Sequence, residues 1–252
     1  MRINITGPKV YFTIPITDSF GIEISETVVN EWIFMAVLIG LALWLAHDLR
    51  VRNVTKRQAV AELIVTTLNN FVINNMGETG RKYIPYIGTL FAMSFIGSIS
   101  GVLGFKPYTA TLCVTMSFAF VTFIMTQVVM IRSQGLKAWL HSFVEPVPFM
   151  LPLNIISNAA TPISMGFRHF GNIFAGTVIT ALIYGALGAA SSMLLGWIPN
   201  QIISSIPILQ VGLPAVLSVY FDWFSAFMQA YIICMLTMVF VANACAVEDA
   251  QS

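Results

Sequence analysis

The chain has 252 residues, of which 57% are hydrophobic and only 9% are charged. Because a soluble domain carries about a quarter charged residues, this composition excludes a soluble globular protein and indicates an integral membrane protein. The formal net charge of +1, without any Lys- or Arg-rich patch, gives no support for nucleic acid as a partner.

Residues 1–27 hold two prolines and several acids and are predicted to form an extramembrane arm. The arm lacks the apolar core of a signal peptide and the Arg- and Ser-rich character of a transit peptide. We therefore expect the first span, over 28–47, to direct insertion itself, in a bacterial plasma membrane. This apolar run has Trp32 and Trp44 near its ends, where aromatic rings anchor to the membrane surface.

Residues 57–76 differ from the spans on either side. Apolar residues such as Val60, Leu63 and Ile64 recur at helical spacing, while Glu62 interrupts them. This pattern is typical of an amphipathic helix that lies on the membrane surface.

The rest of the chain is predicted to cross the membrane as two helix pairs. Two apolar runs within 84–131, joined by a short polar loop, predict a helical hairpin. Two longer regions fill 147–247, and each exceeds the roughly 20 residues that cross a bilayer once. These helices should be strongly tilted, with Pro162 and Pro214 as positions for bends. The predicted fold is an all-α integral membrane protein, a single domain over 1–252 with about five membrane-embedded helices plus the surface helix.

The distribution of Lys and Arg predicts the orientation of the chain. Residues 50–82 hold six of them and 132–146 hold two, against two in the N-terminal arm and one in the loop at 104–110. The positive-inside rule then places the first two segments in the cytoplasm and the N-terminus outside. The C-terminus is expected in the cytoplasm if the last two helices form a hairpin.

Only two formal charges, Arg168 and Asp222, lie between Pro146 and Val247. A charge at the centre of a membrane helix costs roughly 2.5–3.5 kcal/mol on insertion scales, so it indicates a functional site. Polar side chains share the helical face of each charge at spacings of three or four: Asn154, Asn158, Thr161, Ser164, Arg168 and Asn172, then Ser218, Asp222, Ser225 and Gln229. Because lipid cannot satisfy these groups, we expect the two faces to line aqueous routes for an ion.

Simpler interpretations remain open for these residues. Arg168 and Asp222 could form a structural salt bridge, since buried membrane charges often pair. Asn172 and Gln229 could act only as interhelical hydrogen-bonding groups. His169 points about 100° away from Arg168 on a helix, and we interpret it as a packing residue rather than a proton carrier.

Two other classes of protein fit the sequence less well. A secondary transporter or other membrane channel that uses the intramembrane Arg–Asp pair would be expected to contain inverted repeats with broken helices, and residues 1–145 hold no matching half. A membrane hydrolase would need a second intramembrane acid or a nucleophile with its base, and neither pattern is present. The three cysteines lack CxxC spacing and clustered histidines, which predicts no metal site.

Three motifs carry a resemblance to a known family. The segment Met165–Gly176, with the sequence MGFRHFGNIFAG, resembles the arginine helix of subunit a of F-type ATP synthases. Residues 107–112 are similar to the start of that family's fourth helix, and 227–232 to its glutamine-bearing last helix. Members often have an acid or His a little over two turns after the arginine, where this chain has Thr177, and they vary between His and acid where it has Asp222.

The resemblance implies a stator subunit that has no catalytic activity of its own and moves ions past a rotating ring of c subunits. Arg168 would contact the ring carboxylates, Asp222 would relay protons with Ser218 and Ser225 beside it in one half-channel, and the polar face over 154–164 would line the other. The implied partners are the c-subunit ring, the peripheral-stalk b subunits, the other ATP synthase subunits and the lipid bilayer. No cofactor and no metal are expected, and the translocated ion is expected to be H⁺, with Na⁺ as the alternative.

Overall fold

The computed structural model describes residues 10–17, 20–47, 49–50, 55–103, 105, 107–144, 147–195 and 219–249. Within these residues, four segments are long and apolar enough to cross a membrane. They lie in α1 (Glu26–Ala46), α4 (Leu112–Gln134), α6 (Leu151–Leu195) and α9 (Ser225–Asp249). The predicted all-α membrane fold is confirmed, although α3 (Ile84–Ile99), the fifth candidate, is too short for this criterion.

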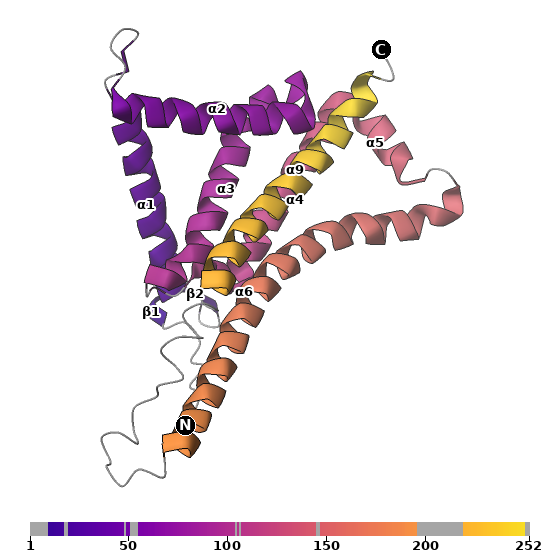
Figure 1. The fold of residues 1–252 in the computed structure, drawn as a ribbon. Coiled ribbons are helices and arrows are strands. Elements are labelled where there is room, and N and C mark those ends of the chain that lie inside the picture. Colours follow the sequence, from indigo (N-terminus) through magenta and orange to yellow (C-terminus); the bar gives the residue numbers. More distant parts are fainter. Residues whose placement is uncertain are drawn as a thin grey trace.

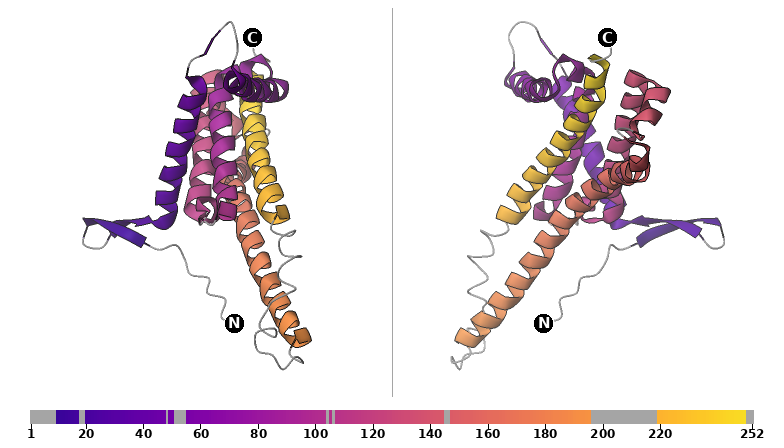
Figure 2. Two further views of the ribbon diagram at one scale, coloured as in Figure 1. Left: turned by 60° about the vertical axis from the view of Figure 1, so that its left-hand side comes forward. Right: turned by 90° about the vertical axis from the view of Figure 1, so that its right-hand side faces the viewer.

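A small β-hairpin precedes the first membrane helix, and the sequence analysis did not predict it. Strand β1 (Val10–Thr17) pairs antiparallel with β2 (Phe20–Ser25), and Figure 2 shows the hairpin pointing away from the helices. β-Branched and aromatic residues dominate β1, which favours a strand. The predicted extramembrane arm thus contains regular structure up to the start of α1.

Helix α2 (Lys56–Met76) runs across one end of α1 and α3, as Figure 1 shows. Thr55 caps its start, because the hydroxyl accepts a hydrogen bond from the backbone N–H of Gln58 at 3.4 Å. It ends at Gly77, whose φ of 68° favours glycine. Apolar side chains such as Leu63 stay exposed, which suits a helix that rests on a membrane surface.

Helices α3 and α4 form the predicted hairpin through short 3-10 turns, among them Tyr108–Ala110. The Tyr108 ring is fully buried against Gly97, where a Cβ atom would overlap it. Its hydroxyl donates a hydrogen bond to the Met93 carbonyl at 2.6 Å. The hairpin is therefore closed by an aromatic side chain that only a glycine admits.

The last two membrane helices differ in shape. After the short helix α5 (Leu136–Ser142) and the turn Pro148–Met150, helix α6 runs for 45 residues with Pro162 inside it. Figure 1 shows that α6 is one continuous, curved helix rather than two pieces joined at a bend. Pro214, the second predicted bend, lies outside the described residues.

Helix α9 follows a π-helical turn over Val219–Phe224 and packs on α3 and α4. Its side chains Ile233, Cys234, Met238 and Val241 form the centre of the hydrophobic core. Thus α3, α4 and α9 make the central bundle, and α6 packs along its side, mainly against α4. This arrangement puts the arginine of α6 at the edge of the bundle.

Candidate functional site

The site begins with a close approach of α6 to α4. A Cβ atom at Gly166 would lie 2.6 Å from the sulfur of Met116 and 3.2 Å from its Cα. Small residues allow two membrane helices to approach in this way. The contact fixes the position of α6 two residues before Arg168.

Arg168 projects from α6 as an exposed side chain. Its guanidinium has no hydrogen bond or ion pair with any residue that the structure describes. It lines a cavity of about 260 Å³ together with Ser164 and Thr161 of its own helix and with Leu236 and Phe240 of α9. An unpaired arginine at membrane depth is an unsatisfied cation, so it requires a partner from outside the described chain or water.

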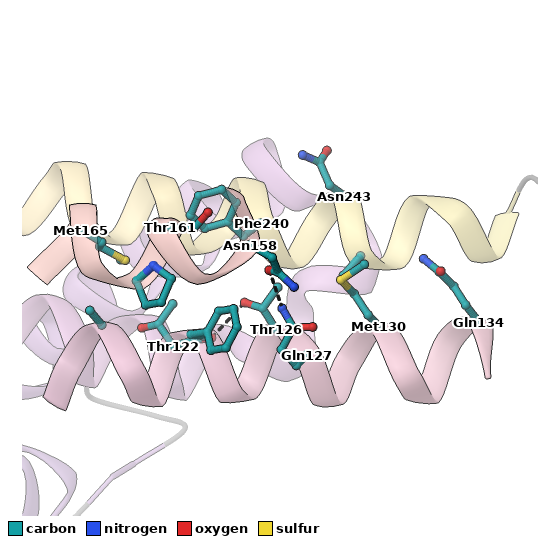
Figure 3. Close-up of a pocket in the computed structure, with 14 residues that line it drawn as sticks. Thr122, Thr126, Gln127, Met130, Gln134, Asn158, Thr161, Met165, Phe240 and Asn243 are labelled. Carbon is teal, nitrogen blue, oxygen red and sulfur yellow. Dashed lines mark hydrogen bonds between the residues drawn. The ribbon is translucent and has the colours of Figure 1, made fainter. Parts of the chain in front are cut away.

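A second cavity, of about 210 Å³, lies between α4, α6 and α9 on the N-terminal side of Arg168 (Figure 3). Asn158 and Thr161 line it, as does Gln127 of α4. The side-chain amide of Gln127 donates a hydrogen bond to the side-chain oxygen Oδ1 of Asn158 at 3.1 Å. Its own oxygen accepts a hydrogen bond from the Trp139 indole at 2.9 Å. Gln127 therefore connects α4, α5 and α6 at the wall of this cavity.

A third cavity, of about 410 Å³, lies on the C-terminal side of Arg168, between α3, α6 and α9. Its polar lining comes from all three helices: Ser98, Asn172, Thr177, Thr180, Tyr184 and Ser225. The Thr180 hydroxyl is buried and has no hydrogen-bond partner among the described residues. Cavities with polar side chains in their lining thus occur on both sides of Arg168 along one helix.

One hydrogen bond ties the arginine helix to the last helix. The side-chain amide of Asn172 donates a hydrogen bond to the side-chain oxygen Oε1 of Gln229 at 2.6 Å, and Gln229 is only 2% exposed. The two residues come from the two polar helical faces predicted from the sequence. The structure therefore brings these faces together at this level of the membrane.

The other predicted residues are distributed as follows. Asn154 donates to the Phe143 carbonyl at 2.9 Å and is not among the residues that line the three cavities. His169 is fully buried, and neither ring nitrogen has a partner in the described part of the chain. Asp222 lies in the π-helical turn, but its side chain is outside the description, as is the whole of Ser218.

Sequence reasoning missed the contribution of α4 to the site. Thr122, Thr126, Gln127 and Gln134 line the cavity on the N-terminal side of Arg168. Thr122 and Thr126 are four residues apart and Gln127 and Gln134 are seven apart, so each pair shares a helical face, which was a usable signal. No formal charge lies between Lys106 and Arg132 to mark this helix, and neutral polar side chains give a weaker sequence signal than charges do.

Replacing Asn172 by leucine should destabilise the protein more than replacing Gln229 by leucine. Loss of Asn172 leaves a buried amide without its partner, which costs about 1–3 kcal/mol, whereas loss of Gln229 leaves the exposed Asn172 free to find water. The double variant should lie near the parent because both polar groups are gone. Thermal unfolding of the three variants checks this order, and equal losses that simply add would contradict it.

The fold and these cavities define a class: an integral membrane protein with an intramembrane arginine, unpaired among the described residues, between two cavities that have polar side chains in their lining. Residues 28–242 match the family model described as ATP synthase A chain. The chain therefore belongs to the ATP synthase subunit a family. It is a membrane Fo subunit of an F-type ATP synthase, without catalytic activity of its own, and its partners are the other ATP synthase subunits.

Curated relatives support the assignment over most of the chain. The sodium-ion-specific ATP synthase subunit a of Propionigenium modestum is 29% identical over 277 residues, covering 98% of this chain and 87% of the relative. ATP synthase subunit a 1 of Syntrophotalea carbinolica is 30% identical, covering 86% and 84%. ATP synthase subunit a of Moorella thermoacetica is 33% identical, covering 65% and 75%. The alternative of a secondary transporter finds no support in these matches.

Proposed function

We propose that this subunit conducts ions between the two sides of the membrane by way of a rotating c-subunit ring, with Arg168 as the group that meets each ring carboxylate. The observation that carries the proposal is the exposed guanidinium of Arg168, unpaired among the described residues and flanked on both sides by cavities with polar side chains in their lining. Such a cation is available to an acid on another chain.

Arginine suits this contact because its strongly basic guanidinium stays protonated and cannot relay protons. When a protonated ring carboxyl approaches, the cation lowers the pKa of the carboxyl and favours release of its proton. The same charge repels a cation that would pass directly from one cavity to the other. Arg168 thus acts both as the trigger of ion release and as the barrier against leakage.

The two flanking cavities are proposed as the inner ends of two half-channels. Asn158 and Thr161 would line one, with Ser164 in the adjoining cavity at Arg168, and Asn172 with Ser225 would line the other. Asp222 lies three residues before Ser225 in the chain, and Ser225 lines the cavity of about 410 Å³ on the C-terminal side of Arg168. A carboxylate close to this cavity can relay protons, and Ser218, four residues earlier in the sequence, would extend the route.

We further propose that the ring and the peripheral-stalk b subunits are direct partners, and that the N-terminus lies outside and the C-terminus in the cytoplasm of a bacterial plasma membrane. The excess of Lys and Arg in 50–82 and 132–146 supports this orientation. H⁺ is the proposed ion. Na⁺ is the second candidate, because one relative is named as sodium ion specific, and pumping by the complex with and without Na⁺ decides between them.

Thiol labelling tests the two half-channels. Cysteine in place of Asn158 or Thr180, in a Cys113→Ser background, should react with a water-soluble maleimide applied from opposite sides of the membrane. We expect each to react at least about tenfold faster than Ile156→Cys, because a thiol in water has a pKa at least about one unit lower than a thiol in an apolar setting.

Ile156→Cys is the matched control, because Ile156 lies on the same helix and is 64% exposed but lines none of the cavities described above. In the assembled membrane it should face lipid. If Asn158→Cys and Thr180→Cys react from the same side, the two cavities belong to one route and the half-channel proposal is wrong.

A further inference from the structure

A cavity far from Arg168 carries positive charge that the ion path does not use. It has a volume of about 350 Å³ and lies between α4, α9 and the 3-10 turn Glu78–Tyr83. Lys82 and Arg132 line it and are exposed, and Tyr83 and Ser133 add hydroxyl groups. Among the described lining residues there is no carboxylate.

The charges of this cavity are not neutralised within the described chain. The Lys82 ammonium lies over the neighbouring Tyr83 ring, 5.3 Å from its centre. The Arg132 guanidinium has no hydrogen bond or ion pair with a described residue. Two cations at one cavity match the needs of a phosphate group, which accepts charge-assisted hydrogen bonds.

The cavity is lined by the end of α4, by α9 and by the turn that follows α2. Figure 1 shows α2 and the C-terminal end of α9 at the same end of the bundle. The Ser133 hydroxyl donates to the Ala244 carbonyl at 2.8 Å and so ties α4 to α9 beside it. Cys245 forms the α9 side of the lining. A ligand would therefore not have to separate the helices in order to bind.

An exposed apolar stripe on α4 leads away from this cavity. Val121, Ile124 and Val128 are 53%, 58% and 40% exposed and lie at helical spacing on the face that ends at Arg132. At 1.5 Å per residue, the distance from Val121 to Arg132 is about 16 Å. The hydrocarbon layer of one leaflet is about 15 Å thick, half of a 30 Å core. The stripe thus matches one acyl chain in depth.

We propose that the cavity at Lys82 and Arg132 binds the phosphate headgroup of an anionic phospholipid whose acyl chain lies along Val121, Ile124 and Val128. Basic cavities between membrane helices are suited to such headgroups. The apolar stripe favours a lipid over free phosphate, which has no chain to place there. This inference rests on the membrane fold and is independent of the role of Arg168.

Photocrosslinking in the assembled ATP synthase tests the proposal. A benzophenone amino acid replaces Ile124, the complex is placed in bilayers of phosphatidylcholine with a minority of phosphatidylglycerol, and the lipid adducts are identified by mass spectrometry. We expect phosphatidylglycerol to be enriched over its share of the bilayer by about fivefold for each cation, since one Lys or Arg near the membrane surface changes binding by about that factor.

Lys82→Gln and Arg132→Gln should each lower the enrichment about fivefold, since each removes one cation. The control is Lys137→Gln, because Lys137 is an exposed cation of α5 that does not line the cavity, and this variant should leave the enrichment unchanged. Excess inorganic phosphate at constant ionic strength should not displace the lipid. Adducts in proportion to the bilayer composition would overturn the proposal, as would displacement by phosphate. A protein adduct in place of lipid would show that a partner helix covers the stripe.

Discussion

Replacing Arg168 by alanine should stop ATP-driven ion pumping by the assembled complex. The arginine is expected to lower the pKa of each ring carboxyl by about 1–3 units, so its loss should slow ion release by about 10- to 1,000-fold. Arg168→Lys should retain part of the activity, because the charge remains but the planar fork is lost. Pumping in liposomes, normalised to the amount of assembled complex, measures the effect.

The control for Arg168→Ala is Phe167→Ala, its neighbour in sequence, which is 51% exposed and carries no charge. It should assemble and pump at a rate near the parent's. If Arg168→Ala also pumped like the parent, the arginine would have a structural role, and the proposed contact with ring carboxylates would be wrong.

A second comparison separates the ion path from a structural salt bridge between Arg168 and Asp222. Breaking a buried ion pair by removing one partner costs about 3–5 kcal/mol, and removing both partners restores much of it. A structural pair therefore predicts that Asp222→Asn rescues the stability of Arg168→Ala. The proposed ion path predicts no such rescue, and it predicts that Asp222→Asn alone lowers pumping.

The sequence was sufficient to predict the membrane class and the face of α6 that carries Arg168, because charge and polarity in a bilayer are costly and follow helical spacing. The sequence could not predict that this face of α6 is divided between contacts with two different helices. From Asn158 to Asn172 the polar side chains keep one face, yet Asn158 meets Gln127 of α4 and Asn172 meets Gln229 of α9. The division arises because α6 curves past two different neighbours (Figure 1).

Two features were not predicted from the sequence. The β-hairpin before α1 was missed although β-branched and aromatic residues dominate β1, because the prolines of the arm weighed against a strand. Asn154 was assigned to a half-channel from its spacing alone, whereas its amide bonds to the Phe143 carbonyl in the turn before α6. Its assignment to the ion path stays a prediction that only a functional test of Asn154 can decide.

Gly166→Ala should damage both stability and pumping, although it is the smallest possible change. The new Cβ would lie 2.6 Å from the Met116 sulfur, which can move, and 3.2 Å from the Met116 Cα, which cannot move without the helix. Overpacking of this kind costs about 1–3 kcal/mol. Because Arg168 follows two residues later, a shift of α6 also displaces the guanidinium, and a misplacement of about 1 Å can cost about 100-fold in rate.

Gly171→Ala on the same helix is the matched control, since no atom lies within 4 Å of its added Cβ. Glycine is about 1 kcal/mol less favourable than alanine inside a helix, so this variant should unfold at the parent's temperature or above it and keep pumping. Met116→Ala should partly rescue Gly166→Ala by removing the sulfur. If Gly166→Ala instead unfolds and pumps like Gly171→Ala, α6 does not depend on close contact with α4. The position of Arg168 must then be fixed by other contacts, such as the hydrogen bond from Asn172 to Gln229.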